Sequence, residues 1–372
     1  MFVEPKCLHL STPFQTQRGV IISQPIIAYE DYGLPNGPVI FIAHGGLSNQ
    51  HAAGRYSSRD LAPGWWDGLI GPEKAFDTNR FRIIATNVLG SMFGTTGPQS
   101  INNETGKIFG PDFPKLTLRD IVRFQKVFLN EIGVERLEVM AGPSMGSMLS
   151  LEMAASYPEF VKGVVAVATA GRTPPPALAA HHFMMNLIKQ DQQFNAGWYG
   201  ENKPKACLKA IYQFSRMFYG HEKLLRKQFW NRLTDGLNSQ DDRSHAAADY
   251  LMEQVDIRIQ AWDPNSIISL LSAINTHDLG CGSESYSDGV KRITCPLLLM
   301  NIDTDQEFQP DWAVEIAEIL NSRTSGQATF RVLESSYGHL GCLMETKQME
   351  PHIRKFMQNA QQRNDSGFAI VN

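Results

Sequence analysis

The sequence predicts an α/β protein in which a mostly parallel sheet is covered by helices on both faces. Short apolar runs typical of buried strands alternate with helical patterns toward both ends of the chain. The alternation stops between residues 172 and 288, where helical patterns continue without convincing strands. A chain of 372 residues exceeds the usual size of a single core, so we expect this stretch to be an inserted helical lid.

Six runs of strand length justify the sheet, because apolar and β-branched residues are frequent in them. Helical patterns at 117–133 and 310–322 supply helices to cover it. We therefore assign residues 1–171 and 289–372 to the α/β core and residues 172–288 to the helical lid. The six predicted strands are residues 38–44, 81–88, 137–141, 163–170, 295–302 and 328–335.

A serine between two glycines follows the third of these strands. Residues 142–146 read Gly-Pro-Ser-Met-Gly and lead into a helical pattern that stops at Tyr157 and Pro158. A strand that enters a helix through G-x-S-x-G is a nucleophile elbow, a strained turn that presents the serine hydroxyl and the next backbone N–H. The alternative is a serine that caps the helix, which is common wherever a strand leads into a helix. The motif alone does not decide between them.

The residues that would activate Ser144 follow in the expected order. A serine nucleophile needs a base, and the base needs an orienting acid. Asp303 and Asp305 come directly after the strand at 295–302, and His339 follows the last predicted strand. The order Ser, Asp, His, each beyond a strand's carboxyl end, is that of the α/β-hydrolase fold. We therefore predict Ser144 as the nucleophile and His339 as the base, with either aspartate as the acid.

The composition argues against several other classes of protein. A net charge of −4 gives no electrostatic reason to bind nucleic acid, and no apolar run is long enough to cross a bilayer. No signal peptide is visible, and we expect the tail after Gln358 to be loosely ordered. The cysteines are odd in number, scattered and without a C-x-x-C pair, so we expect a cytoplasmic chain without disulfides, metal or bound cofactor. They are Cys7, Cys207, Cys281, Cys295 and Cys342.

Longer stretches are more specific than the elbow. The blocks "GWWDGLIGPEKAFDTNRFRIIATNVLGS" (64–91) and "TTGPQSINNETGK" (95–107), together with the elbow, resemble the homoserine O-acetyltransferase family of α/β-hydrolases. The acid of that family lies in an Asp-x-x-Phe-x-Pro motif, which residues 305–310 match, so the resemblance assigns this role to Asp305 and leaves Asp303 as the fallback.

The resemblance also implies a mechanism and a set of ligands. Ser144 would take an acyl group from acetyl-CoA or another acyl-CoA co-substrate and pass it to a small hydroxyl compound in a ping-pong reaction. His44-Gly45-Gly46 matches an oxyanion loop, and the N–H groups of Gly46 and Met145 would bind the oxyanion. Arg216 would grip the carboxylate of the acceptor, because a guanidinium binds a carboxylate bidentately. The family further implies a homodimer formed through lid helices.

One departure from the family concerns the substrate. The family commonly has an aspartate after the histidine, where it can pair with the ammonium of homoserine, and this chain has Leu340. A leucine leaves that buried charge unpaired, so we expect weak use of homoserine unless another carboxylate, such as Asp278, supplies the charge. Three functions remain open: acyl transfer to a small hydroxyl compound, esterase-like hydrolysis with the same three residues, and binding without catalysis.

Overall fold

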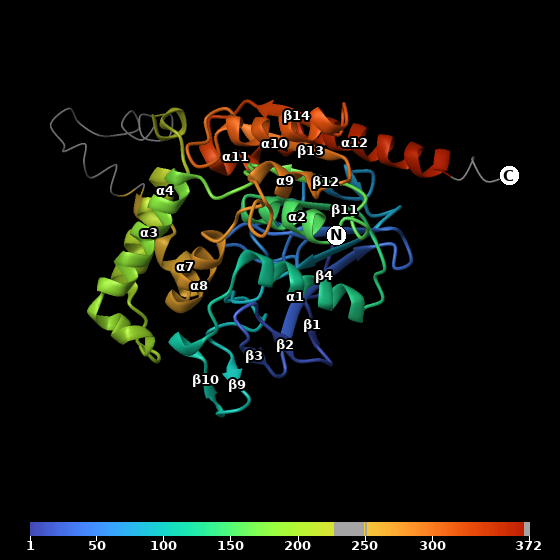
Figure 1. Cartoon of the computed structure of the whole chain (residues 1–372). Helices are drawn as coiled ribbons and strands as arrows, with labels where there is room; N and C mark the ends of the chain where they lie inside the picture. Colours follow the sequence, from blue (N-terminus) through green and yellow to red (C-terminus); the bar gives the residue numbers. More distant parts are fainter. Residues whose placement is uncertain (227–248, 250, 368–372) are drawn as a thin grey trace.

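The central sheet of the computed structural model confirms the predicted fold class. The structure describes residues 1–226, 249 and 251–367. In these residues eight strands form one sheet in the order β1-β4-β8-β5-β11-β12-β13-β14. The six predicted strands are all present and mutually parallel (Figure 1). They are β5 (Val39–Ala43), β8 (Arg82–Thr86), β11 (Leu137–Pro143), β12 (Val164–Val167), β13 (Leu297–Ile302) and β14 (Ala328–Leu333).

The sequence analysis missed the two strands at one edge of the sheet. β1 (Lys6–His9) pairs antiparallel with β4 (Ile26–Gly33), and β4 pairs antiparallel with β8. β1 is almost fully exposed, and β4 carries two acidic residues, so neither forms the continuous apolar run by which the buried strands were recognised. Three short pairs lie outside the main sheet: β2 (Phe14–Gln15) with β3 (Ile21–Ile22), β6 (Ile70–Gly71) with β7 (Phe76–Asp77), and β9 (Ile101–Asn102) with β10 (Lys107–Ile108).

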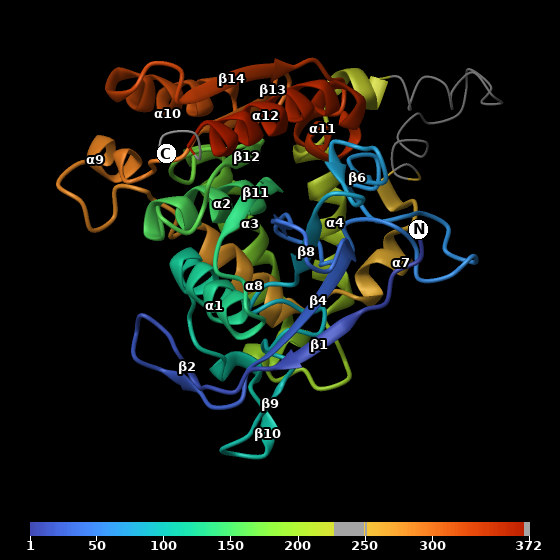
Figure 2. The ribbon, with the colours of Figure 1, turned by 90° about the vertical axis from the view of Figure 1, so that its right-hand side faces the viewer.

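Helices cover both faces of the sheet, as Figure 2 shows. Alternate side chains of β5 illustrate the two layers: Phe41 packs in one hydrophobic cluster, and Ile40 and Ile42 pack in the other. The first cluster includes side chains of α1 (Leu118–Glu131), α2 (Met145–Ser156) and α10 (Pro310–Arg323), and the second includes those of α12 (Thr346–Gly367). A capping box at Thr117 begins α1 at the predicted place.

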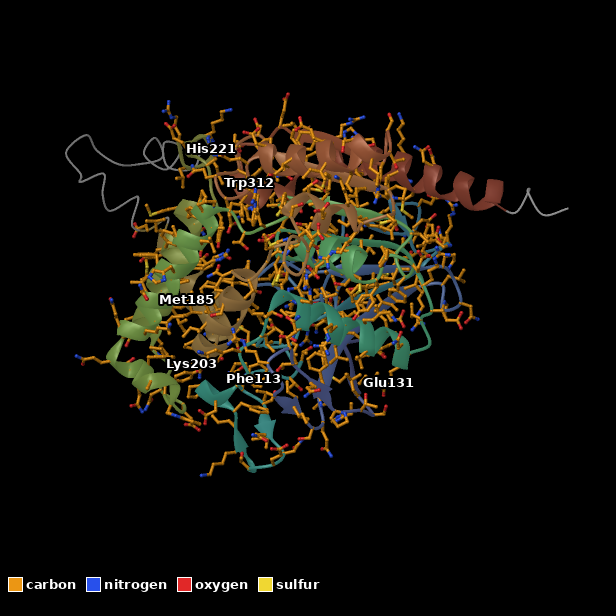
Figure 3. All side chains as sticks on the ribbon, viewed as in Figure 1. Phe113, Glu131, Met185, Lys203, His221 and Trp312 are labelled. Carbon is orange, nitrogen blue, oxygen red and sulfur yellow. The ribbon has the colours of Figure 1, made fainter. Side chains whose placement is uncertain are left out.

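The chain between β12 and β13 is helical in its described parts. α3 (Pro175–Gln190), α4 (Lys205–Phe218), α7 (Val255–Gln260) and α8 (Pro264–Ile274) gather on one side of the sheet in Figure 1. Met185 of α3 faces α8, where its Sδ atom lies 3.4 Å from Oγ of Ser272 (Figure 3). These helices fall in the predicted lid, and its residues 227–248 and 250 lie outside the described residues. The shorter helices are η1 (Gly110–Asp112), η2 (Gln192–Gly197), α9 (Tyr286–Lys291), η3 (Gly338–Leu340) and α11 (Gly341–Met344).

The carboxyl-terminal segment differs from the sequence prediction. Residues 359–367 of the expected loose tail continue α12 in helical geometry, and residues 368–372 lie outside the described residues. Met349, Ile353 and Phe356 anchor the start of this helix in the second hydrophobic cluster, and the chain continues in helical geometry beyond them. None of the described helices combines the length and the apolar character that a membrane span requires.

Candidate active site

Ser144 lies in a strained turn between β11 and α2. Its φ of 55° and ψ of −125° are unusual for a residue with a Cβ, and its N–H donates to the carbonyl of Val167 at 2.9 Å. The flanking glycines allow this turn, because a Cβ at Gly142 or Gly146 would come within 2.5 or 2.1 Å of the carbonyl oxygen of Ala43. The end of β5, where Ala43 lies, is therefore too close to the serine turn for any residue larger than glycine at positions 142 and 146.

The hydroxyl of Ser144 does not cap the helix. Ser144 occupies the cap position of α2, yet its side chain accepts no hydrogen bond from the first turn. Its Oγ atom lies 2.9 Å from Nε2 of His339. The geometry thus excludes the helix-cap interpretation and directs the hydroxyl toward an imidazole.

His339 links Ser144 to Asp305. The Nδ1 atom of His339 lies 2.8 Å from Oδ2 of Asp305, and both side chains are buried. The other carboxylate oxygen of Asp305 accepts the N–H groups of Glu307 and Phe308 at 2.8 and 3.0 Å, so the carboxylate is held on both sides. The structure therefore brings Ser144, His339 and Asp305 into one series of hydrogen bonds.

Asp303, the alternative acid, lies in a different environment. Its Oδ1 atom accepts the N–H of Ser335 at 2.9 Å and joins the loops that follow β13 and β14. Among the described contacts, none joins the Asp303 carboxylate to His339.

Opposing effects act on the imidazole of His339. Burial alone would lower its pKa, but the negative charges of Asp305 and Glu307 and the hydrogen bond to Asp305 outweigh burial and raise the pKa to about 9. The imidazolium is therefore stabilised at neutral pH while no substrate is bound.

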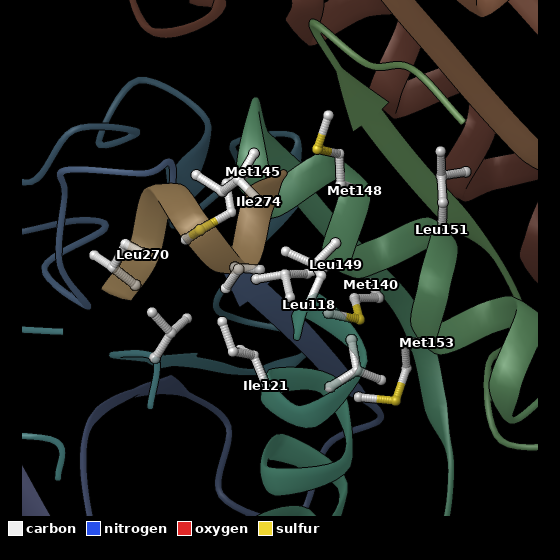
Figure 4. Packing of buried hydrophobic residues seen from close by; sticks show 14 of the residues in the cluster. Leu118, Ile121, Met140, Met145, Met148, Leu149, Leu151, Met153, Leu270 and Ile274 are labelled. Carbon is white, nitrogen blue, oxygen red and sulfur yellow. The ribbon is translucent and has the colours of Figure 1, made fainter. Parts of the chain in front are cut away.

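The His44-Gly45-Gly46 loop lies against the elbow. A Cβ at Gly45 would be 3.7 Å from the Cβ of Ser144, and a Cβ at Gly46 would be 3.3 Å from Ile274 of α8. Figure 4 shows Ile274 beside Met145. Among the described residues, the N–H groups of Gly46 and Met145 donate no hydrogen bond, so both are available to a ligand.

His44 itself is fully buried behind this loop. Its Nδ1 lies 2.7 Å from the carbonyl oxygen of Gly45, and its Nε2 accepts the N–H of Val88 at 3.2 Å. Burial lowers the pKa of His44 to about 4, so the ring is neutral and shapes the loop.

Arg216 is near the carboxyl end of α4. Its Nη1 donates to the hydroxyl of Tyr212 at 3.1 Å, and its Nη2 lies 3.8 Å from the exposed carboxylate of Glu253. Tyr219, three residues further on, packs against His339 with ring centroids 5.4 Å apart. The described side-chain contacts of Arg216 are thus with Tyr212 and Glu253, and none of them joins it to Ser144 or His339.

The sequence analysis missed a second carboxylate at the site. Glu307 is buried in the loop after β13, and its two oxygens lie 3.4 Å from Nε2 of His339 and 3.4 Å from Nε2 of His181. Its position within the Asp-x-x-Phe-x-Pro stretch was visible, but its neighbour His181 comes from α3, far away in the sequence. Asp278, which the sequence analysis considered, is exposed and accepts the N–H of Gly280.

Across residues 1–226, 249 and 251–367, no group of three His, Cys, Asp or Glu side chains is arranged to hold a metal ion. The chemistry available to these residues is nucleophilic attack by a hydroxyl with proton transfer through an imidazole.

Comparison with known proteins identifies the family of this chain. A family model described as the alpha/beta hydrolase fold matches residues 38–346. The homoserine O-acetyltransferase of Moorella thermoacetica is 36% identical over 357 residues, which are 95% of this chain and 94% of that protein. The solved homoserine O-acetyltransferase of Bacillus anthracis is 26% identical with a TM-score of 0.89, covering 96% of this chain and 98% of that one.

An esterase of known structure is similar over the same length. It is 30% identical with a TM-score of 0.87, covering 96% of this chain and all of that one. A solved variant of that esterase, in which one leucine is replaced by aspartate, also has a TM-score of 0.87.

The sheet, the strained serine turn and the matching family model define an enzyme of the α/β-hydrolase fold. Within that class, the chain belongs to the homoserine O-acetyltransferase family, which is a family of acyltransferases. The resemblance of the sequence to this family is therefore confirmed.

Proposed function

We propose that this enzyme transfers an acetyl group from acetyl-CoA to the hydroxyl of a small acceptor, with Ser144 as the acyl carrier. The observation that carries the proposal is the 2.9 Å contact between Oγ of Ser144 and Nε2 of His339, continued to Asp305 at 2.8 Å. A base within hydrogen-bond reach of a hydroxyl is the geometric requirement for general-base activation.

In the first half-reaction, Ser144 attacks the thioester carbonyl while His339 takes the hydroxyl proton. The N–H groups of Gly46 and Met145 stabilise the oxyanion, and the thiol of CoA departs with the proton that His339 returns. In the second half-reaction, the acceptor hydroxyl gives its proton to His339 and attacks the acetyl-Ser144 carbonyl. Ser144 then leaves and recovers the proton. Asp305 holds the imidazole in the required tautomer throughout.

The acceptor has a site on the helical side of the protein. Arg216 would bind the acceptor carboxylate in place of its long contact to Glu253, since a planar guanidinium suits a carboxylate. The predicted lid would keep water from the acyl-enzyme, which transfer requires. A homodimer formed through lid helices and a cytoplasmic location remain predictions.

Hydrolysis is the second candidate, with water as the acceptor. Two observations favour it: the similarity to a solved esterase, and an apolar Leu340 directly after His339. Full-length similarity to several homoserine O-acetyltransferases gives transfer the stronger support.

Timed discharge of the acyl-enzyme tests the proposal. The protein is acetylated with acetyl-CoA, freed of excess reagent, and followed in water alone and with L-homoserine or simple alcohols. We expect slow loss of the acetyl group in water and fast loss with an acceptor. Equal loss with and without acceptor would identify a hydrolase.

A further inference from the structure

Glu307 lies on the reacting side of His339. Its Oε2 atom is 3.4 Å from Nε2 of His339, the same nitrogen that lies 2.9 Å from Oγ of Ser144. Asp305 contacts the opposite nitrogen, Nδ1, so Asp305 and not Glu307 orients the imidazole of His339. Glu307 is therefore a second carboxylate placed where the reacting groups of a substrate meet Ser144, and the transfer mechanism gives it no contact with a substrate.

The carboxylate of Glu307 can accept hydrogen bonds from a further cationic donor. A buried carboxylate is strongly disfavoured unless it is paired and hydrogen-bonded. Among the described residues, no hydrogen bond reaches its oxygens, and its contacts to His181 and His339 are each 3.4 Å long. Charged N–H···O bonds are normally about 2.7–2.9 Å long. A cationic donor that comes closer to the Glu307 oxygens would form stronger hydrogen bonds with them than the two imidazoles do at 3.4 Å.

Helices of the predicted lid enclose this carboxylate. His181 of α3 is itself buried, and its Nδ1 lies 2.7 Å from Oδ1 of Asn275, which fixes the ring. The carboxyl end of α4 lies against the loop that carries His339, because a Cβ at Gly338 would come within 2.7 Å of the carbonyl oxygen of Tyr219. Burial and the charges of Glu307 and Asp305 raise the pKa of Tyr219 well above its ordinary value, so its hydroxyl stays neutral beside the carboxylate.

We propose that Glu307 binds the ammonium group of an amino-acid substrate of Ser144, so that the site takes hydroxy-amino acids or their esters in preference to neutral analogues. Arg216, in the last turn of α4, would hold the carboxylate at the other end of the same molecule. The inference rests on the proposed function, because it concerns the same site. It also reverses the expectation of weak homoserine use, because Glu307 supplies the charge that Leu340 and the exposed Asp278 do not.

Two acetyl esters that differ only in the ammonium group test the inference. O-acetyl-L-homoserine carries it, and 4-acetoxybutanoate lacks it. The second-order rate constant for acetylation of Ser144 by each ester is measured by rapid quenching and mass spectrometry of the intact protein. The measurement is made on the wild-type protein, on Glu307→Gln and Glu307→Asp, and on the control Glu315→Gln. Glu315 lies on α10 and forms an ion pair with Arg172 at 2.9 Å, and none of its described contacts is with His339.

The preference for the cationic ester should fall by roughly 10²-fold in Glu307→Gln, since a lost charge partner typically costs a few kcal/mol. Glu307→Asp should retain part of the preference, and Glu315→Gln should retain all of it. A wild-type protein without preference, or an unchanged ratio in Glu307→Gln, would overturn the inference. An equal loss with both esters would overturn it too, because it would indicate a role in the chemistry or the fold.

Failure of the proposed function gives a different result. Discharge of the acetyl-enzyme by water alone would show that the enzyme is a hydrolase, yet the ester preference would still report on Glu307. Acetylation of Ser144 by esters and discharge of the acetyl-enzyme are separate steps. The first measurement therefore tests the role of Glu307, and the second tests the proposed function.

Discussion

The Nε2 atom of His339 lies 2.9 Å from the Oγ atom of Ser144, although 195 residues separate the two in the chain. The parallel sheet makes this contact possible. Ser144 follows β11 and His339 follows β14, and both strands end at the same edge of the sheet. Each residue therefore reaches the other from a loop beyond the carboxyl end of its strand.

The nucleophile can be identified with a fluorophosphonate probe. We expect covalent labelling of the wild-type protein and none of Ser144→Ala, with turnover reduced by several orders of magnitude because the hydrogen-bonded residues act as a unit. Ser150→Ala is the matched control, since Ser150 lies on the same helix and donates to the carbonyl of Gly146 at 2.8 Å. Labelling that persists in Ser144→Ala would point to a different serine.

The two aspartates after β13 should differ sharply. Asp305→Asn should lower turnover by about 10⁴-fold, because the amide stabilises the wrong tautomer of His339. Asp303→Asn should affect turnover far less, since that carboxylate accepts the backbone N–H of Ser335 and does not contact the imidazole. Steady-state rates and thermal unfolding of both variants provide the check. The reverse ranking of rates would mean that the motif identifies the wrong residue.

The acylation rate should depend on pH through His339. Its pKa is raised to about 9, and Ser144 needs the neutral imidazole as its base. The kcat/KM for a neutral ester such as p-nitrophenyl acetate should therefore rise with pH and level off above about 9, because kcat/KM reports the free enzyme. Glu307→Gln removes one of the charges that raise this pKa, so its profile should shift to lower pH. A wild-type inflection at or below 6.5 would contradict this account.

Arg216 should matter only for substrates that carry a carboxylate. Arg216→Gln should raise the KM for such acceptors by roughly 10- to 10²-fold, as expected for a lost charged pair. The reaction with p-nitrophenyl acetate should change little. Arg226→Gln is the control, because Arg226 pairs with Glu222 on an exposed surface. An equal loss with acceptors that lack a carboxylate would assign Arg216 a structural role, through Tyr212 and Glu253.

How much of the structure the sequence predicts depends on whether a feature is a local pattern or a contact between residues far apart in the chain. Buried parallel strands form continuous apolar runs, and the elbow at Ser144 is a local pattern, so both were visible in the sequence. β1 and β4 escaped prediction because β1 is almost fully exposed and two acidic residues interrupt the apolar run of β4. Glu307 escaped because its role depends on His181, and only the folded chain brings α3 to the loop after β13.

The central claim is that Ser144 carries the acyl group, and one measurement tests it most directly. The protein is mixed with acetyl-CoA, quenched in acid and digested, and the mass of the peptide containing Ser144 is determined by tandem mass spectrometry. The account predicts one acetyl group on Ser144, which disappears when L-homoserine is added before quenching. Acetylation at other residues only, with the Ser144 peptide unmodified, would contradict it.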